Sequence, residues 1–402
     1  MSVRLAARAL ERGDALGALN LVGRTTGAVG QLLRGIAYAQ LGDLQLGAAS
    51  LQTAAHDGDA LTAARARAAL VEIALRSAEP EAAGRAARAA VAELGALGDA
   101  RNAALLQLMV ARSELLLGRL AEARCTIEAL TVPAELVAVA WLARAEVAIR
   151  AIAATDASRA LEHAERALAV HPQALLAREL AGLQRELALP IARVARAGVT
   201  RDADLSAIEQ VSRGDVLLVD ACRLVAIAGR ATIPFARRPV LFALLDALAR
   251  AWPGALPRDA LAQRAFDVRR VNGSHRARLR VEVGRLRSVL ADLAAFPEAT
   301  REGYALRSKR EVVCLFPASD DDGARLTLLL GDGAAWSAQS LAEHAGVSRR
   351  TAQRALAALV ERGQALRIGA GRDVRYVRQG RPLASRLLLL GLLPRSGREH
   401  AD

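Results

Sequence analysis

The chain has 402 residues, of which 53% are hydrophobic and 24% charged, so it can bury a core and is not disordered by composition. Lys309 is the only lysine beside 54 arginines, and only 3% of residues are aromatic, which argues against a β-rich protein. A Walker A loop, a Schiff-base enzyme and a phosphoacceptor receiver domain each require a lysine at a defined place, and no glycine-rich loop precedes Lys309. Because GxSxG, HExxH and paired CxxC motifs are also absent, we expect no enzymatic activity, cofactor or metal site.

The net charge of +13 is concentrated in the second half of the chain. Residues 1–195 carry 21 basic and 20 acidic side chains, whereas residues 196–402 carry 34 basic and 22 acidic ones. A codon bias towards arginine would affect both halves of the chain alike. The difference in charge between the halves therefore indicates a polyanionic partner, either nucleic acid or an anionic membrane. Scattered cysteines, no signal peptide and no apolar run of membrane-spanning length favour a cytoplasmic protein.

From Leu5 to about Leu189, Ala, Leu and Arg recur at helical periodicity, which predicts one helix after another. Small residues repeat at intervals of 36, 40 and 37 residues, at Gly47, Ala83, Ala123 and Ala160. With the Gly42-Asp43 turn, this spacing resembles the tetratricopeptide repeat. The resemblance implies an α-solenoid of about five helical hairpins over residues 1–195, with a groove for a protein or peptide. The alternative is a helical domain that only packs, spaces or dimerises the chain.

Short β-like runs follow at Val216–Val219, Leu224–Ile227 and Thr232–Phe235, and three helices are expected after them. These helices are predicted from Arg237 to Trp252, from Pro257, and from His275 to about Leu293 with Ser274 as the cap, before a hairpin at Thr300–Leu306. The passages Ile233–Leu245, Val281–Leu290 and Arg301–Leu306 resemble the OmpR/PhoB-type winged-helix output domain of bacterial regulators. The resemblance implies an α+β domain over residues 210–318 whose third helix enters the DNA major groove.

The third helix of this domain has an apolar stripe, and its other sides are basic. Between Arg264 and Arg287 there are eight arginines against two acidic residues. A merely solvated face would carry interspersed glutamates, but only Glu282 lies on the helix. Guanidinium groups read guanine edges or bind phosphates, so we expect DNA contacts from the helix and the wing. The residues predicted are Arg276, Arg278, Arg280, Arg285, Arg287 and Arg301.

A helix-turn-helix pattern spans Leu341–Leu359, with Ala342 at the helix crossing, Gly346 in the turn and Ser348 as the cap of the second helix. A hairpin with a glycine-rich tip follows at residues 365–377. The segment is similar to the winged helix-turn-helix of many bacterial regulators, which implies a second α+β domain over residues 323–380. The predicted DNA contacts are Ser348, Arg349, Arg350, Thr351, Gln353, Arg354 and, at the hairpin tip, Arg372. A phosphate-cradling loop is the other interpretation of the tip, but no helix follows it.

Residues 381–402 contain a short apolar segment, Leu383–Leu393, that would pack on the second wing or form a dimer contact. The combined prediction is a mainly α protein with an N-terminal α-solenoid and two α+β winged-helix domains. Two independent reading helices favour DNA over membrane, so we expect a cytoplasmic, nucleoid-associated transcription regulator that binds double-stranded DNA sequence-specifically. The alternative is an architectural or scaffold protein whose winged helices bind DNA non-specifically or bind protein partners.

Overall fold

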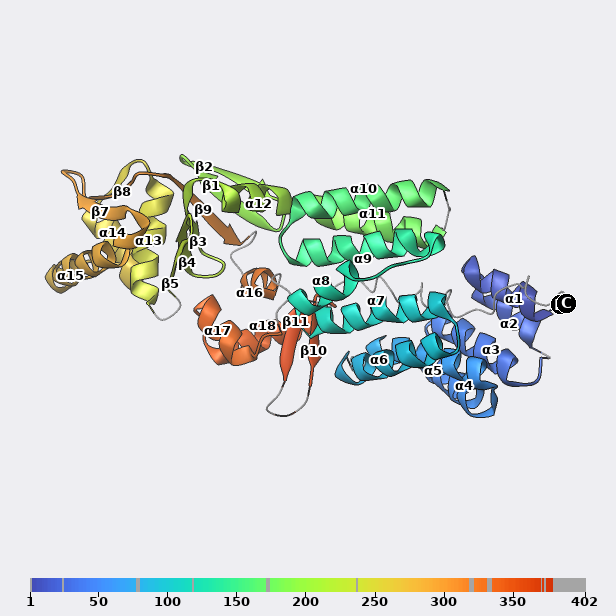
Figure 1. Cartoon of the computed structure of the whole chain (residues 1–402). Helices are drawn as coiled ribbons and strands as arrows, with labels where there is room; N and C mark the ends of the chain where they lie inside the picture. Colours follow the sequence, from blue (N-terminus) through green and yellow to red (C-terminus); the bar gives the residue numbers. More distant parts are fainter. Residues whose placement is uncertain are drawn as a thin grey trace.

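The computed structural model describes residues 2–378, apart from residues 24, 77–79, 118, 171–173, 236–237, 318–321, 331–334, 370 and 372–373. Within this part the molecule is mainly helical with three small sheets, as Figure 1 shows. The predicted fold class is therefore confirmed at this level: mainly α, with a helical N-terminal region. The predicted hairpin-tip residue Arg372 and the segment Leu383–Leu393 lie outside the described residues.

The N-terminal region consists of consecutive helices, each of which packs against the next along the chain. Their apolar sides share one continuous core. The helices are α1 (Ser2–Glu11), α2 (Ala15–Val22), α3 (Ala28–Leu41), α4 (Leu44–Asp57), α5 (Ala60–Arg76), α6 (Pro80–Ala96), α7 (Ala100–Leu116), α8 (Leu120–Glu128), the 3-10 turn η1 (Ala134–Leu136), α9 (Val137–Arg150), α10 (Ala154–Val170) and α11 (Ala174–Ala188). The recurring small residues Gly47, Ala83, Ala123 and Ala160 are all buried and lie on α4, α6, α8 and α10.

Gly-Asp dipeptides explain several of the tight helix-to-helix turns. Gly42 ends α3 in the left-handed conformation (φ 96°), which a residue with a Cβ adopts only at a cost. The carboxylate of Asp43 then accepts a hydrogen bond of 3.0 Å from the Leu46 N–H and caps α4. Gly13 (φ 80°) and Asp14 act in the same way before α2. One dipeptide thus both stops a helix and starts the next, which keeps the connection short.

The middle region contains a six-stranded sheet of order β2-β1-β9-β3-β4-β5. Its strands are β1 (Ala192–Arg196), β2 (Val199–Ala203), β3 (Val216–Asp220), β4 (Val225–Ala228), β5 (Ala231–Pro234) and β9 (Glu311–Pro317). Neighbouring strands are antiparallel except β3 and β9, which are parallel. The sheet begins at Ala192, inside the segment that was predicted to be helical repeats. Ala192 starts β1, which pairs with β9 from the far end of the region.

Helix α12 (Leu205–Arg213) begins in the interval between the first two predicted domains, extends into the second, and packs against both regions. Its Leu205 is buried in the core of the N-terminal helices. Its Glu209 carboxylate accepts hydrogen bonds of 2.8 and 2.9 Å from the backbone N–H and the hydroxyl of Thr155 on α10. Burial of Glu209 opposes ionisation, but these hydrogen bonds together with the nearby Arg213 guanidinium outweigh it and hold the pKa of the carboxyl below its usual value.

A helical layer packs against the sheet through α13 (Pro239–Ala251), α14 (Arg258–Phe266) and α15 (Gly273–Val289). A second sheet of order β6-β8-β7 contains β6 (Ala255–Leu256), β7 (Ala295–Ala299) and β8 (Tyr304–Ser308).

Two predicted limits of the third helix of this region, α15, are wrong. Asn272, not Ser274, caps α15, because its side chain accepts the His275 N–H at 3.0 Å while the His275 ring accepts the Asn272 N–H. The helix also ends at Val289, and the 3-10 turn η2 (Ala291–Leu293) follows it.

The last described region has a small core of its own. It is formed by α16 (Asp322–Leu330), α17 (Ala338–Ala345), α18 (Arg349–Glu361) and the antiparallel hairpin of β10 (Ala365–Ile368) and β11 (Arg375–Arg378). Trp336 forms an isolated bridge to Tyr376, with N–H to carbonyl hydrogen bonds of 2.9 and 2.7 Å in the two directions. The hairpin is thereby joined to the segment that precedes α17.

Candidate nucleic-acid interface

The start of α18 is fixed by the turn that leads into it. Gly346 adopts the left-handed conformation (φ 67°) at the end of α17. Ser348 caps α18, because its hydroxyl oxygen accepts the Thr351 N–H at 3.1 Å and lies 2.8 Å from the Thr351 hydroxyl. Ser348 and Thr351 are both among the residues predicted to contact DNA, and in the free chain their hydroxyl groups contact each other. Ala352, Leu356 and Leu359 bury the opposite side of the helix.

The exposed side of α18 presents three guanidinium groups and one amide from its first two turns. Arg349, Arg350, Gln353 and Arg354 are all exposed. None of these four side chains forms a hydrogen bond or ion pair with another described residue, and the first turn of the helix has no acidic side chain. These cations repel each other and the positive end of the helix dipole, so an anion bound here would relieve an existing electrostatic cost. We call these four residues the α18 face.

The arginines of α15 have different surroundings, because most of them are bound within the chain. Arg276 donates to both carboxylate oxygens of Asp259 on α14, at 2.9 and 2.7 Å. This pairing holds the pKa of the Asp259 carboxyl below its usual value and raises that of Arg276. Arg278 lies over the ring of Phe266, with its guanidinium carbon 4.6 Å from the ring centroid.

Two more of the predicted α15 arginines have partners, one on the same helix and one on a neighbouring strand. Arg285 pairs with Glu282 at 3.0 Å. Arg287 donates to the backbone carbonyl of Pro297 on β7 at 2.8 Å, so it stabilises the hairpin. Among the predicted residues of this region, Arg280 on α15 and Arg301 in the β7–β8 turn are exposed and have no such contact with a described residue. The predicted arginines of this region therefore fall into two groups: those that already contact another part of the chain, and those that are free to contact a partner.

Arg238 is a further basic residue near α15 and is not among the residues predicted from the sequence. It precedes Pro239, the first residue of α13, and is exposed. A shallow recess of about 390 Å³ brings it together with Arg285 and Glu282 of α15. The consecutive arginines before a proline at a helix start were the available signal, but only the fold brings α13 and α15 together.

Other kinds of site receive little support from the described residues. No group of three or more His, Cys, Asp or Glu side chains in that part of the chain could hold a metal ion. None of its helices combines the length and the apolar character that crossing a membrane requires. Comparisons of the chain with protein-family models, with curated proteins and with solved structures found no match.

Proposed function

We propose that the chain is a sequence-specific, double-stranded DNA-binding transcription regulator with two winged-helix units after a tetratricopeptide-like helical stack. The observation that carries this proposal is the α18 face: Arg349, Arg350, Gln353 and Arg354, exposed, adjacent on one helix and unneutralised by any described residue. An α-helix fits the major groove, where arginine donates two hydrogen bonds to guanine and glutamine pairs with adenine. A buried apolar side and a capped start hold the helix firmly enough to present such a face.

In this proposal the two units contribute differently to binding. The α18 face reads base edges, since its side chains lack internal partners. On α15 and the β7–β8 turn, Arg280 and Arg301 are available, whereas the Nε–Nη2 edge of Arg276 is held by the Asp259 carboxylate. We therefore assign α15 chiefly to backbone contacts, which position the protein without reading sequence.

The charge distribution supports nucleic acid as the partner. The excess positive charge lies in residues 196–402, which include both units, and the N-terminal stack is close to neutral. Binding through arginine–phosphate contacts releases counterions, so affinity should fall steeply as salt increases. The near-neutral stack fits a different task, the recognition of a signal or the assembly of copies.

The test is selection of bound duplexes from a random DNA library by the full chain at a fixed salt concentration. Enrichment of one motif with two half-sites is the expected result. A variant with Arg350→Ala and Arg354→Ala should enrich no motif, and Arg362→Ala provides a matched control, because Arg362 follows the same helix and donates to the Ala358 carbonyl. Retention of all duplexes alike by the unmodified chain would overturn the proposal in favour of an architectural protein.

A further inference from the structure

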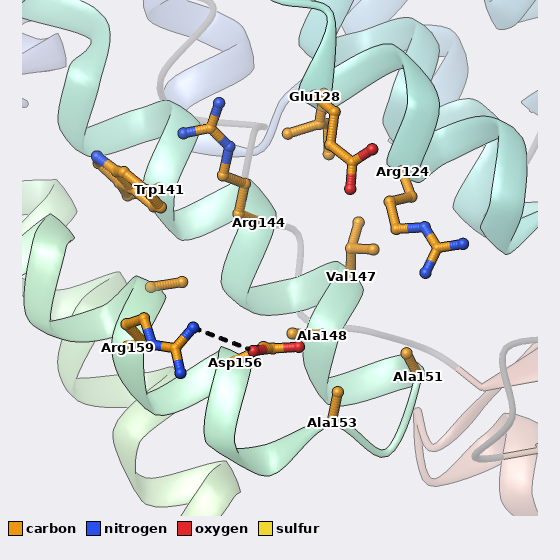
Figure 2. Close-up of a pocket in the computed structure, with 12 residues that line it drawn as sticks. Arg124, Glu128, Trp141, Arg144, Val147, Ala148, Ala151, Ala153, Asp156 and Arg159 are labelled. Carbon is orange, nitrogen blue, oxygen red and sulfur yellow. Dashed lines mark ion pairs between the residues drawn. The ribbon is translucent and has the colours of Figure 1, made fainter.

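The N-terminal stack contains a cavity where its succession of helices is interrupted. Helix α8 has nine residues, whereas α6 and α10 have 17 each, and residues 129–136 intervene before α9. A cavity of about 320 Å³ lies among α8, α9 and α10 (Figure 2). This volume is in the range that small-ligand sites occupy, and the cavity is open on one side.

The floor of the cavity is aliphatic. It is formed by Ile127 of α8, by Val147 and Ala148 of α9, and by Ala160 of α10, all of them buried. Trp141 also borders the cavity, but its ring already stacks on His163 with centroids 4.2 Å apart. The surface left for a ligand is therefore aliphatic, which suits an apolar chain.

Positive charge exceeds negative charge around this floor. Asp156 and Arg159 form an ion pair of 3.6 Å. The remaining charged residues of the lining are two cations, Arg124 and Arg144, and one anion, Glu128. Arg144 is half-buried with its guanidinium carbon 4.4 Å from the centre of the Trp141 ring, and it has no ion pair with a described residue. A half-buried guanidinium without a counter-ion is a strong site for a carboxylate, because both partners are partly removed from water.

From this arrangement we infer that the cavity binds an aliphatic chain that ends in a carboxylate, with the chain on the aliphatic floor and the carboxylate at Arg144. Two sources share that chemistry: a small aliphatic acid, and the C-terminal end of an apolar peptide. The inference goes beyond DNA binding and does not depend on it, because the site lies in the helical stack and is tested without DNA.

Isothermal titration calorimetry of the full chain tests the inference with probes of matched length. Octanoate represents the small acid, and acetyl-Ala-Leu-Leu-Leu with a free carboxylate represents the peptide end. Octanol, octylamine and the amidated peptide remove or reverse the charge. We expect at least one of the two carboxylates to bind more than tenfold tighter than its uncharged and cationic counterparts, and the one that does so identifies the source.

Variants locate the binding. Arg144→Met should weaken the preferred carboxylate at least tenfold, whereas Arg185→Met, which removes an exposed arginine from α11 outside the cavity, should leave its binding unchanged. Ala151→Phe would fill the cavity from an exposed position and should abolish binding even if Arg144→Met perturbs the fold. The inference is overturned if neither carboxylate binds, if each carboxylate that binds is matched in affinity by its uncharged counterpart, or if Ala151→Phe binds the preferred carboxylate normally.

Discussion

At the scale of single residues, the arginines of α15 and α18 differ in their partners rather than in their exposure. Arg276 is exposed, yet Asp259 occupies the Nε–Nη2 edge of its guanidinium group, while Arg354 on α18 has no described partner. The sequence could predict that both are surface cations on helices. It could not predict the pairing of Arg276, because Asp259 lies 17 residues away on another helix. The local Arg285–Glu282 pair, in contrast, was visible as a three-residue spacing.

Asp259→Asn should strengthen DNA binding in a salt-dependent manner. The substitution removes a negative charge and releases Arg276 for a phosphate, so the slope of log affinity against log salt should steepen by about one unit. Fluorescence anisotropy titrations at several salt concentrations provide the measurement. Asp292→Asn is the control, because Asp292 is exposed in η2 and has no described ion pair. An unchanged slope for Asp259→Asn would remove Arg276 from the DNA contacts.

The three cysteines should differ sharply in reactivity. Cys125 is exposed, whereas Cys222 and Cys314 are buried, and burial raises the pKa of the Cys314 thiol to about 12. Because the thiolate is the nucleophile, Cys314 has almost no reactive form at pH 8. Iodoacetamide should therefore add one group to the native chain and three to the denatured chain, as measured by intact mass. Labelling of Cys314 in the native chain at a rate comparable to that of Cys125 would contradict this account of the core.

At the scale of secondary-structure elements, the crossing of α3 and α4 depends on glycines, whose lack of a side chain lets the two helices approach closely. A Cβ on Gly35 would lie 2.6 Å from the Leu51 Cγ and 3.0 Å from the Gly47 carbonyl oxygen. Gly35→Ala should destabilise the stack by about 1–3 kcal/mol through overpacking. Gly95→Ala is the opposite case, because a Cβ there meets no neighbouring atom, and it should stabilise α6 by about 0.5–1 kcal/mol. Thermal unfolding followed by circular dichroism measures both, and an equal shift for the two variants would contradict the close crossing.

Some helices and strands could be predicted from the sequence better than others, and the difference has a physical reason. Helix α18 was predictable because its cap, turn and apolar spacing are all local signals. Strands β1 and β2 were missed, since most of their side chains are not buried and their pairing depends on β9, more than 100 residues further along. The cap of α15 was assigned to Ser274 because serine is a good cap, yet Asn272 two residues earlier also is one, and only the backbone distinguishes them.

At the scale of the whole molecule, the pairing of β1 with β9 determines where the chain can be divided. A fragment of residues 210–402 lacks β1, β2 and the first half of α12, and it exposes the edge of β9 together with the buried Val313 and Leu315. Unpaired edges and exposed apolar surface promote aggregation. We expect residues 191–402 to be monodisperse in size-exclusion chromatography and residues 210–402 to aggregate or unfold at a lower temperature. Identical behaviour of the two fragments would mean that β1 and β2 do not complete this region.

The most direct test of the central claim is whether the α18 face reads bases. The measurement is the affinity of the full chain and of Arg354→Ala for a selected duplex and for every single base-pair substitution of it. We predict that Arg354→Ala loses about 1–3 kcal/mol of discrimination at one position and keeps the others, while Arg362→Ala retains the whole profile. A uniform loss across all duplexes for Arg354→Ala would contradict the claim and reduce the α18 face to a phosphate contact.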